Sequence, residues 1–214
     1  MTEFETADLL TLNKLFVFGS MSTGRVHFQK ISAFVTESRP GSIQAYMYKL
    51  KVGLPVAVWP TENDLGQIVT GELLSLKPDT EMLFNLLDSF HSVNRMDENK
   101  SLFLRKKIPV QVETNQFEWA WCYFMNPGHL PAGSARIDGT QWSQMMNEEK
   151  SLIETLSDRQ KTYILKLGKA SGRETVPIND LTLYRELMNL ELIVDKGRRL
   201  ALSKLGNEVF RYLN

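Results

Sequence analysis

Short apolar runs, each ended by glycine, proline or a polar turn, dominate the first two-thirds of the sequence. One of them, Leu15-Phe16-Val17-Phe18, stops at Gly19-Ser20. Runs of this length indicate buried strands rather than helices. We expect strands over residues 15–18, 45–50, 57–59, 67–74, 103–112 and 118–125, and one helix that opens at Pro78-Asp79-Thr80. Many strands with few helices predict an α+β fold, either a mixed β-barrel or a curved sheet.

Glycine and proline carry further expectations in this part of the chain. Gly71 interrupts the run over residues 67–74, which indicates a bulge or a close backbone approach. Residues 91–101 are polar and are expected to form a loop. Residues 127–140 are rich in proline and glycine, so we expect a loop there rather than a packed element.

The end of the chain has a different pattern, with apolar residues at helical spacing. A helix is expected after Ser157, with Gly168 at its end, and a second helix after Pro177, with Leu183, Leu187 and Leu190 facing inward. A short hairpin and a last helix over residues 203–213 complete this part. The order resembles a winged-helix domain, and Gly206 fits the L-S-x-x-G start of its last helix. We therefore expect one domain over residues 1–146 and a small winged-helix-like (α+β hairpin) domain over residues 147–214.

Charge is distributed unevenly between these parts. Residues 151–214 carry a net charge of +3 and residues 1–150 a net charge of −3, so the whole chain is neutral. A neutral chain gives no support to polyanion binding by the whole protein. The acidic N-terminus is unlike a signal peptide and no apolar stretch approaches about 20 residues, so we expect a cytoplasmic protein with no membrane partner. The single cysteine, Cys122, lies in an apolar run and is interpreted as a buried structural thiol.

Six short stretches occur in a fixed order: LFVFGSM (15–21), VTGELLSL (69–76), LLDSFH (86–91), FLRKKIPVQV (103–112), WAWCYFMN (119–126) and IDGTQW (137–142). Each is unspecific alone. Together they resemble the motifs of the gamma-glutamylcyclotransferase-like, or AIG2-like, family over residues 14–146. The resemblance implies a mixed β-barrel and a small gamma-glutamyl or carboxylate ligand.

The first of these stretches suggests where such a ligand binds. A strand that ends at Gly19-Ser20 exposes successive backbone N–H groups, which can form a concave anion site. In the family this loop holds the carboxylate end of a gamma-glutamyl group, so the resemblance implies contacts from Phe18, Gly19, Ser20 and Met21. The alternative is an ordinary strand-to-loop turn.

The resemblance also implies a reaction. The α-amine of the gamma-glutamyl group attacks its own side-chain amide, closes 5-oxoproline and releases an amine, and one carboxylate with a raised pKa can move both protons. In the family that carboxylate is a glutamate at the position of His91. A histidine can act as a base near neutral pH, but it cannot serve as a counter-ion to a protonated amine. Asp97 or Glu98, in the loop that follows, could supply the carboxylate; otherwise both are solvated loop acids and His91 is a surface or cap histidine.

Two aromatic residues complete the expected pocket. Phe103 replaces the tyrosine of the family's Y.R motif, and Tyr123 lies where the family also has a tyrosine. Phe18 replaces a further tyrosine, so Phe18, His91 and Phe103 have together lost three polar groups. This suggests a pocket with altered chemistry, a pseudoenzyme candidate. The histidines lack metal-ligand spacing and no phosphate or dinucleotide motif is present, so we expect no metal and no cofactor.

The winged-helix-like part offers a different kind of contact. Lys196, Arg198 and Arg199 lie at the hairpin turn, where basic side chains can contact phosphates. Arg185 lies on the preceding helix, which in such domains enters the major groove. A protein-interaction module fits the same features.

Three functions follow. In the first, the protein cyclises a gamma-glutamyl-type small molecule as a transferase or lyase. In the second, an inactive first domain senses such a ligand and the winged helix reports it to DNA or protein, as in a transcriptional regulator. In the third, both domains serve only as interaction surfaces. The lost polar groups favour the second on mechanism.

Overall fold

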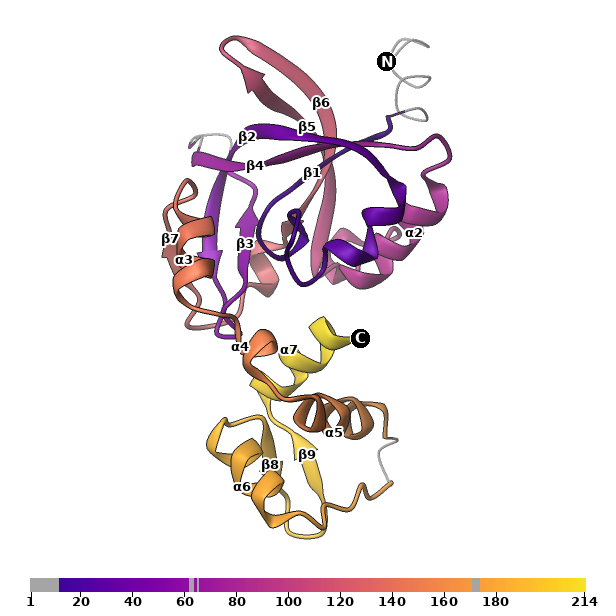
Figure 1. Cartoon of the computed structure of the whole chain (residues 1–214), viewed down its shortest axis with the longest axis vertical. Helices are drawn as coiled ribbons and strands as arrows, with labels where there is room; N and C mark the ends of the chain where they lie inside the picture. The colour runs from indigo at the N-terminus through magenta and orange to yellow at the C-terminus, as the bar shows by residue number, and fades with distance from the viewer. Residues whose placement is uncertain (1–11, 62–63, 65, 171–173) are drawn as a thin grey trace. The chain divides into compact units, whose positions relative to one another are not determined.

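The computed structural model describes residues 12–61, 64, 66–170 and 174–214, and the chain forms two compact units (Figure 1). The first unit runs to Leu50 and resumes over Leu54–Glu148. The second unit takes Lys51–Gly53 and Glu149–Asn214.

Five strands close a barrel in the first unit. They are β1 (Lys14–Val17), β2 (Val35–Lys49), β4 (Gln67–Leu76), β5 (Phe103–Glu113) and β6 (Gln116–Met125). Their order is β2-β4-β1-β6-β5, and the pairing of Ser42 with Gln111 joins β5 back to β2. β1 and β6 are parallel, and the other neighbours are antiparallel. Two more strands, β3 (Pro55–Val58) and β7 (Ala135–Ile137), pair with β2 outside the ring. The expected α+β barrel with few helices is confirmed.

A glycine allows two of these strands to meet closely. A Cβ atom at Gly71 would lie 2.4 Å from the carbonyl oxygen of Val17 and 2.6 Å from the Phe16 ring. No larger residue fits without moving β1 away from β4. The close backbone approach predicted at Gly71 is therefore confirmed.

Short helices fill the connections of the first unit. The 3-10 helices are η1 (Gly19–Met21), η2 (Phe28–Lys30), η3 (Ser32–Phe34), η4 (Glu98–Lys100) and η5 (Pro127–His129), and the α-helices are α2 (Glu81–Phe90) and α3 (Trp142–Glu148). α2 packs Leu83, Phe84 and Leu87 into the core. Thr80 is its N-cap residue, but its side chain makes no capping bond.

Two expectations for the first unit are wrong. β2 begins at Val35, ten residues before the predicted strand, because its first half is polar and half-exposed and is held by pairing with β4. Residues 127–140 are not only a loop, since β7 pairs Ile137 with Met47 and Gly139 packs against the backbone of Ile68. A three-residue strand between Gly133 and Gly139 is too short to leave a sequence pattern.

The second unit contains α4 (Leu152–Thr155), α5 (Asp158–Lys169), α6 (Leu181–Asn189), β8 (Ile193–Asp195), β9 (Leu200–Leu202) and α7 (Lys204–Leu213). Side-chain caps start the longer helices: Ser157 and Gln160 form a capping box, and Asp180 and Ser203 accept first-turn N–H groups. The hairpin and the last helix lie where the sequence predicts them.

Other details of the second unit differ from the predictions. Gly168 lies inside α5, where its missing Cβ makes room for the Phe210 ring of α7. Leu190 was expected inward but is 36% exposed, because α6 ends at Asn189. Among the described residues between α5 and β8, α6 is the single helix.

The contact at Gly71 gives a test of the barrel. Gly71→Ala should destabilise the first unit by about 1–3 kcal/mol, the usual cost of an overpacked core. Ile68→Ala is the matched control on β4, because Ile68 is 51% exposed and its loss should cost little. Denaturant unfolding of both variants measures the difference. Equal stability of the two variants would contradict the close approach of β1 and β4.

Candidate functional site

The loop after β1 is a tight turn with two uncommitted donors. Gly19 has φ 62°, and a Cβ there would lie 2.8 Å from Cγ of Pro55. The N–H groups of Met21 and Ser22 donate within the turn, to Phe18 and Gly19. Within the described chain, no hydrogen bond occupies the N–H groups of Gly19 and Ser20. Phe18 and Ser20 are half-buried, whereas Gly19 and Met21 are buried.

His91 follows the last residue of α2 and lies among aromatic rings. Its imidazole stacks on Tyr123, with ring centres 4.2 Å apart and planes 19° apart. The rings of Phe103 and Phe90 lie 4.8 and 5.0 Å away. The structure thus brings together three of the predicted site residues, His91, Phe103 and Tyr123, and adds Phe90.

This surrounding changes the acid–base character of His91. Desolvation, assisted by the nearby His27, lowers the pKa of His91 from 6.5 to about 3. The imidazole is therefore neutral at physiological pH. Its Nδ1 is buried and has no hydrogen-bond partner among the described residues.

His27 connects the two parts of the site, which the sequence did not suggest. Its backbone N–H donates to the carbonyl of Ser20 at 2.9 Å, so it fixes the loop after β1. Its buried ring lies 5.1 Å from that of Phe90. No local pattern joins residues 20, 27 and 91, because only the fold brings them close.

A buried carboxylate, Asp88, was also missed. It accepts a hydrogen bond from the Tyr123 hydroxyl at 2.7 Å and one from Nε of Arg95 at 2.8 Å. Nη1 of Arg105 lies 3.6 Å from it. Burial and then the hydrogen bond to Asp88 raise the pKa of Tyr123, so its hydroxyl stays protonated. Asp88 and Arg105 stand in two of the motif stretches, which is the one signal that could have indicated them.

Asp97 and Glu98 lie in their own loop. Asp97 caps η4 by accepting the N–H of Asn99 at 3.1 Å, and its carboxylate lies 3.1 Å from Nζ of Lys100. Glu98 is exposed, and its backbone carbonyl accepts a bond from Asn126. No hydrogen bond or ion pair of the described residues joins either carboxylate to His91 or to the loop after β1.

In the second unit, the predicted basic residues are exposed. Arg185 lies on α6, next to Glu186, which accepts bonds from Arg159 and Gln160. Lys196, Arg198 and Arg199 lie at the turn between β8 and β9, which a bond from Lys196 N–H to the Arg199 carbonyl closes.

Several features bear on other functions. Within the described residues, no group of three or more histidine, cysteine, aspartate or glutamate side chains could hold a metal ion. None of the helices described is long and apolar enough to span a membrane. Cys122 is fully buried and burial raises the pKa of its thiol, which confirms the structural interpretation.

Comparison with known proteins gives one family match. A family model described as "Gamma-glutamyl cyclotransferase, AIG2-like" matches residues 15–144. No curated protein matches the chain.

Solved structures similar to the chain have low identity. YkqA from Bacillus subtilis is 20% identical with a TM-score of 0.46, and the match covers 65% of this chain and 43% of YkqA, less than half its length. An AIG2-like protein from Mus musculus is 18% identical with a TM-score of 0.43, covering 56% of this chain and 80% of that one. A protein from Arabidopsis thaliana is 20% identical with a TM-score of 0.41, covering 78% and 93%.

The lowered pKa of His91 predicts a pH-dependent stability. The unfolded chain binds a proton at His91 below about pH 6.5, whereas the folded chain does not until about pH 3. The contribution of the neutral His91 to the free energy of unfolding is therefore fully present above pH 6.5. The free energy of unfolding falls as the pH drops through this window, by up to about 1.4 kcal/mol per pH unit.

Denaturant unfolding at pH 7 and pH 5 tests this effect. His91→Phe should keep the aromatic packing, and its stability should decrease less between pH 7 and pH 5 than that of the wild type. The control is His129→Gln, since His129 is exposed and its loss should leave the fall unchanged. A His91→Phe protein as acid-sensitive as the wild type would show that His91 titrates normally.

Proposed function

The chain belongs to the gamma-glutamyl cyclotransferase, AIG2-like family, and on that premise we propose that its first unit binds a small gamma-glutamyl-type ligand without cyclising it. The observation that carries the proposal is the packing of His91 against Tyr123. In place of the proton-shuttling carboxylate that the family resemblance implies, this position holds a neutral imidazole ring.

Ligand binding is supported by the loop after β1. Within the part of the chain that the structure describes, the N–H groups of Gly19 and Ser20 have no acceptor, so they can donate to a carboxylate, and neighbouring backbone amides of this kind bind anions well. Nδ1 of His91 is a buried polar atom with no hydrogen-bond partner among the described residues. Such an atom is costly to leave unsatisfied, and a donor group of a ligand would satisfy it.

We expect no turnover because none of the described residues of the site is suited to the two proton transfers that cyclisation requires. The base must take a proton from the attacking amine and return one to the leaving amine, which works best when its pKa lies near the working pH. A histidine with a pKa of about 3 is a weak base and is not protonated at pH 7, so it cannot act as the acid either. Two other carboxylates are already engaged. Asp88 pairs with two arginines and accepts a hydrogen bond from Tyr123, and Asp97 pairs with Lys100.

Binding and turnover can be separated with one substrate, gamma-glutamylalanine. Calorimetry should show saturable binding to the wild type, and Gly19→Ala should weaken it at least tenfold because the added Cβ meets Pro55. Gly24→Ala is the matched control: Gly24 also has a positive φ, but nothing lies within 4 Å of an added Cβ.

The same samples are then assayed for 5-oxoproline, and none is expected above the uncatalysed rate. Release that survives His91→Ala and disappears in Glu98→Gln would instead support the enzymatic alternative with a displaced carboxylate. Equal binding by the Gly19 and Gly24 variants would contradict the ligand site itself.

For the second unit, a winged-helix-like domain over residues 147–214 remains the proposal from the sequence. The exposed basic turn between β8 and β9 and the order α5, α6, hairpin, α7 support it. α6 is the one helix among the described residues between α5 and β8, which weighs against a helix-turn-helix pair, so the hairpin carries the proposed phosphate contacts.

These contacts would be electrostatic and independent of DNA sequence. Binding to a short duplex in low salt should weaken as salt rises, and Lys196→Gln/Arg198→Gln should lower the salt slope by about 2, roughly one for each lost phosphate contact. Lys161→Gln/Lys166→Gln on α5 is the control, because it removes the same charge elsewhere in the unit. No mobility shift at low salt would rule out this role.

A further inference from the structure

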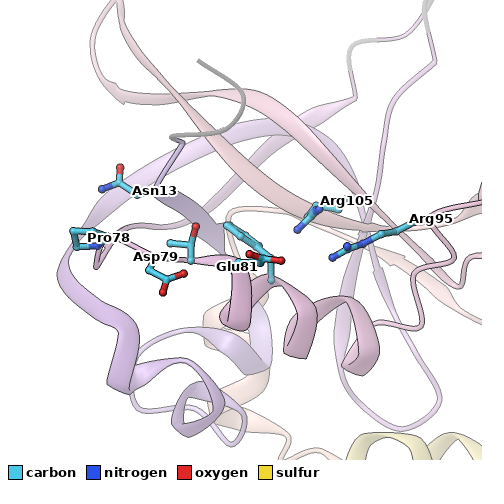
Figure 2. Close-up of a pocket in the computed structure, with 8 residues that line it drawn as sticks. Asn13, Pro78, Asp79, Glu81, Arg95 and Arg105 are labelled. Carbon is cyan, nitrogen blue, oxygen red and sulfur yellow. The ribbon is translucent and has the colours of Figure 1, made fainter. Parts of the chain in front are cut away.

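We propose that a cavity at the start of α2 is a second ligand site, which takes a zwitterionic amino acid. The cavity has a volume of about 550 Å³, within the range of small-molecule pockets. Asp79, Glu81, Phe84, Arg95 and Arg105 line it, and Asn13 lies at its edge (Figure 2). His91 follows the last residue of α2, about 15 Å along the helix axis from Glu81. The residues that line the cavity include none of residues 18–22, so the cavity is distinct from the loop after β1.

One side of the cavity carries surplus positive charge. Arg95 and Arg105 lie together there, and they share a single buried carboxylate, Asp88. The guanidinium of Arg105 is also held over the rings of Phe84 and Trp121, at 4.9 and 5.1 Å. Two fixed guanidinium groups with one counter-ion leave N–H donors for a second carboxylate, which arginine binds in a planar, two-bond geometry.

The other charged groups are two acids. Asp79 precedes α2, with φ 65°, and Glu81 is the first residue of the helix. Neither carboxylate has a hydrogen bond or an ion pair within the described part of the chain. They are thus available to accept from an ammonium group.

A zwitterion matches this arrangement better than a singly charged ligand. Its carboxylate meets the guanidinium groups of Arg95 and Arg105, and its ammonium meets Glu81 and Asp79. A carboxylate alone would be repelled by the two acids, and an amine alone by the two arginines. Pro78, an exposed residue that also lines the cavity, offers an apolar surface for the remainder of the ligand.

Leucine and its two singly charged analogues test the proposal. NMR titration of the ¹⁵N-labelled full chain should show saturable shifts of the amides of residues 79–84 with leucine. 4-Methylpentanoate lacks the ammonium and 3-methylbutylamine lacks the carboxylate, and each should bind at least tenfold more weakly. Binding of either analogue as tight as that of leucine, or no saturation by leucine at tens of millimolar, would overturn the proposal.

Charge-neutral variants assign the contacts. Glu81→Gln should weaken leucine binding about tenfold and leave 4-methylpentanoate binding unchanged or tighter. Glu113→Gln, at an exposed position on the hairpin of β5 and β6, is the control and should change neither. A Glu81→Gln protein that binds leucine normally would overturn the role of the acid, and its melting temperature shows whether it is folded.

The site is separable from the loop after β1. Gly19→Ala should leave the leucine-induced shifts at residues 79–84 intact, whatever it does to gamma-glutamylalanine binding. Leucine-induced shifts confined to residues 19–21 would overturn this inference without affecting the proposed function.

Discussion

The buried carboxylate of Asp88 is the constraint on which the described site depends. It joins α2 to β6 through the Tyr123 hydroxyl, to β5 through Arg105, and to the loop after α2 through Arg95. A buried charge is tolerated only when it is paired and hydrogen-bonded, so these elements are held in one arrangement. The Tyr123 ring that Asp88 fixes is the ring on which His91 stacks.

The two ends of α2 consequently differ in chemistry. At its C-terminal end, Asp88 is buried and hydrogen-bonded to Tyr123, and His91 is left neutral against aromatic rings. Arg95 and Arg105, which share the Asp88 carboxylate, also line the cavity that reaches the N-terminal end of the helix, where Asp79 and Glu81 remain unpaired within the described chain. The same network therefore holds both the ring on which His91 stacks and the two arginines that line the cavity.

Sequence patterns predicted most of the elements that bury an apolar face. The predicted positions of β1, β4, β5, β6, α2, α5, the β8–β9 hairpin and α7 lie close to the observed ones, whereas only the end of β2 is predicted. The failures have a common cause. The first half of β2 and the short β7 are held by backbone pairing with distant strands, and such pairing leaves no periodicity in the residues concerned.

The sequence by itself determined the family and the strand-to-glycine loop, and it predicts that His91 stands at the position of the family's glutamate, because these are properties of short stretches in a fixed order. Only the tertiary structure determined the protonation state of His91. Its pKa depends on burial among residues 27, 90, 103 and 123, which are spread over the chain. Likewise, the fold turned Asp97 toward its own loop and placed Asp88 under Tyr123, since electrostatics depends on distance in space and not on order in the chain.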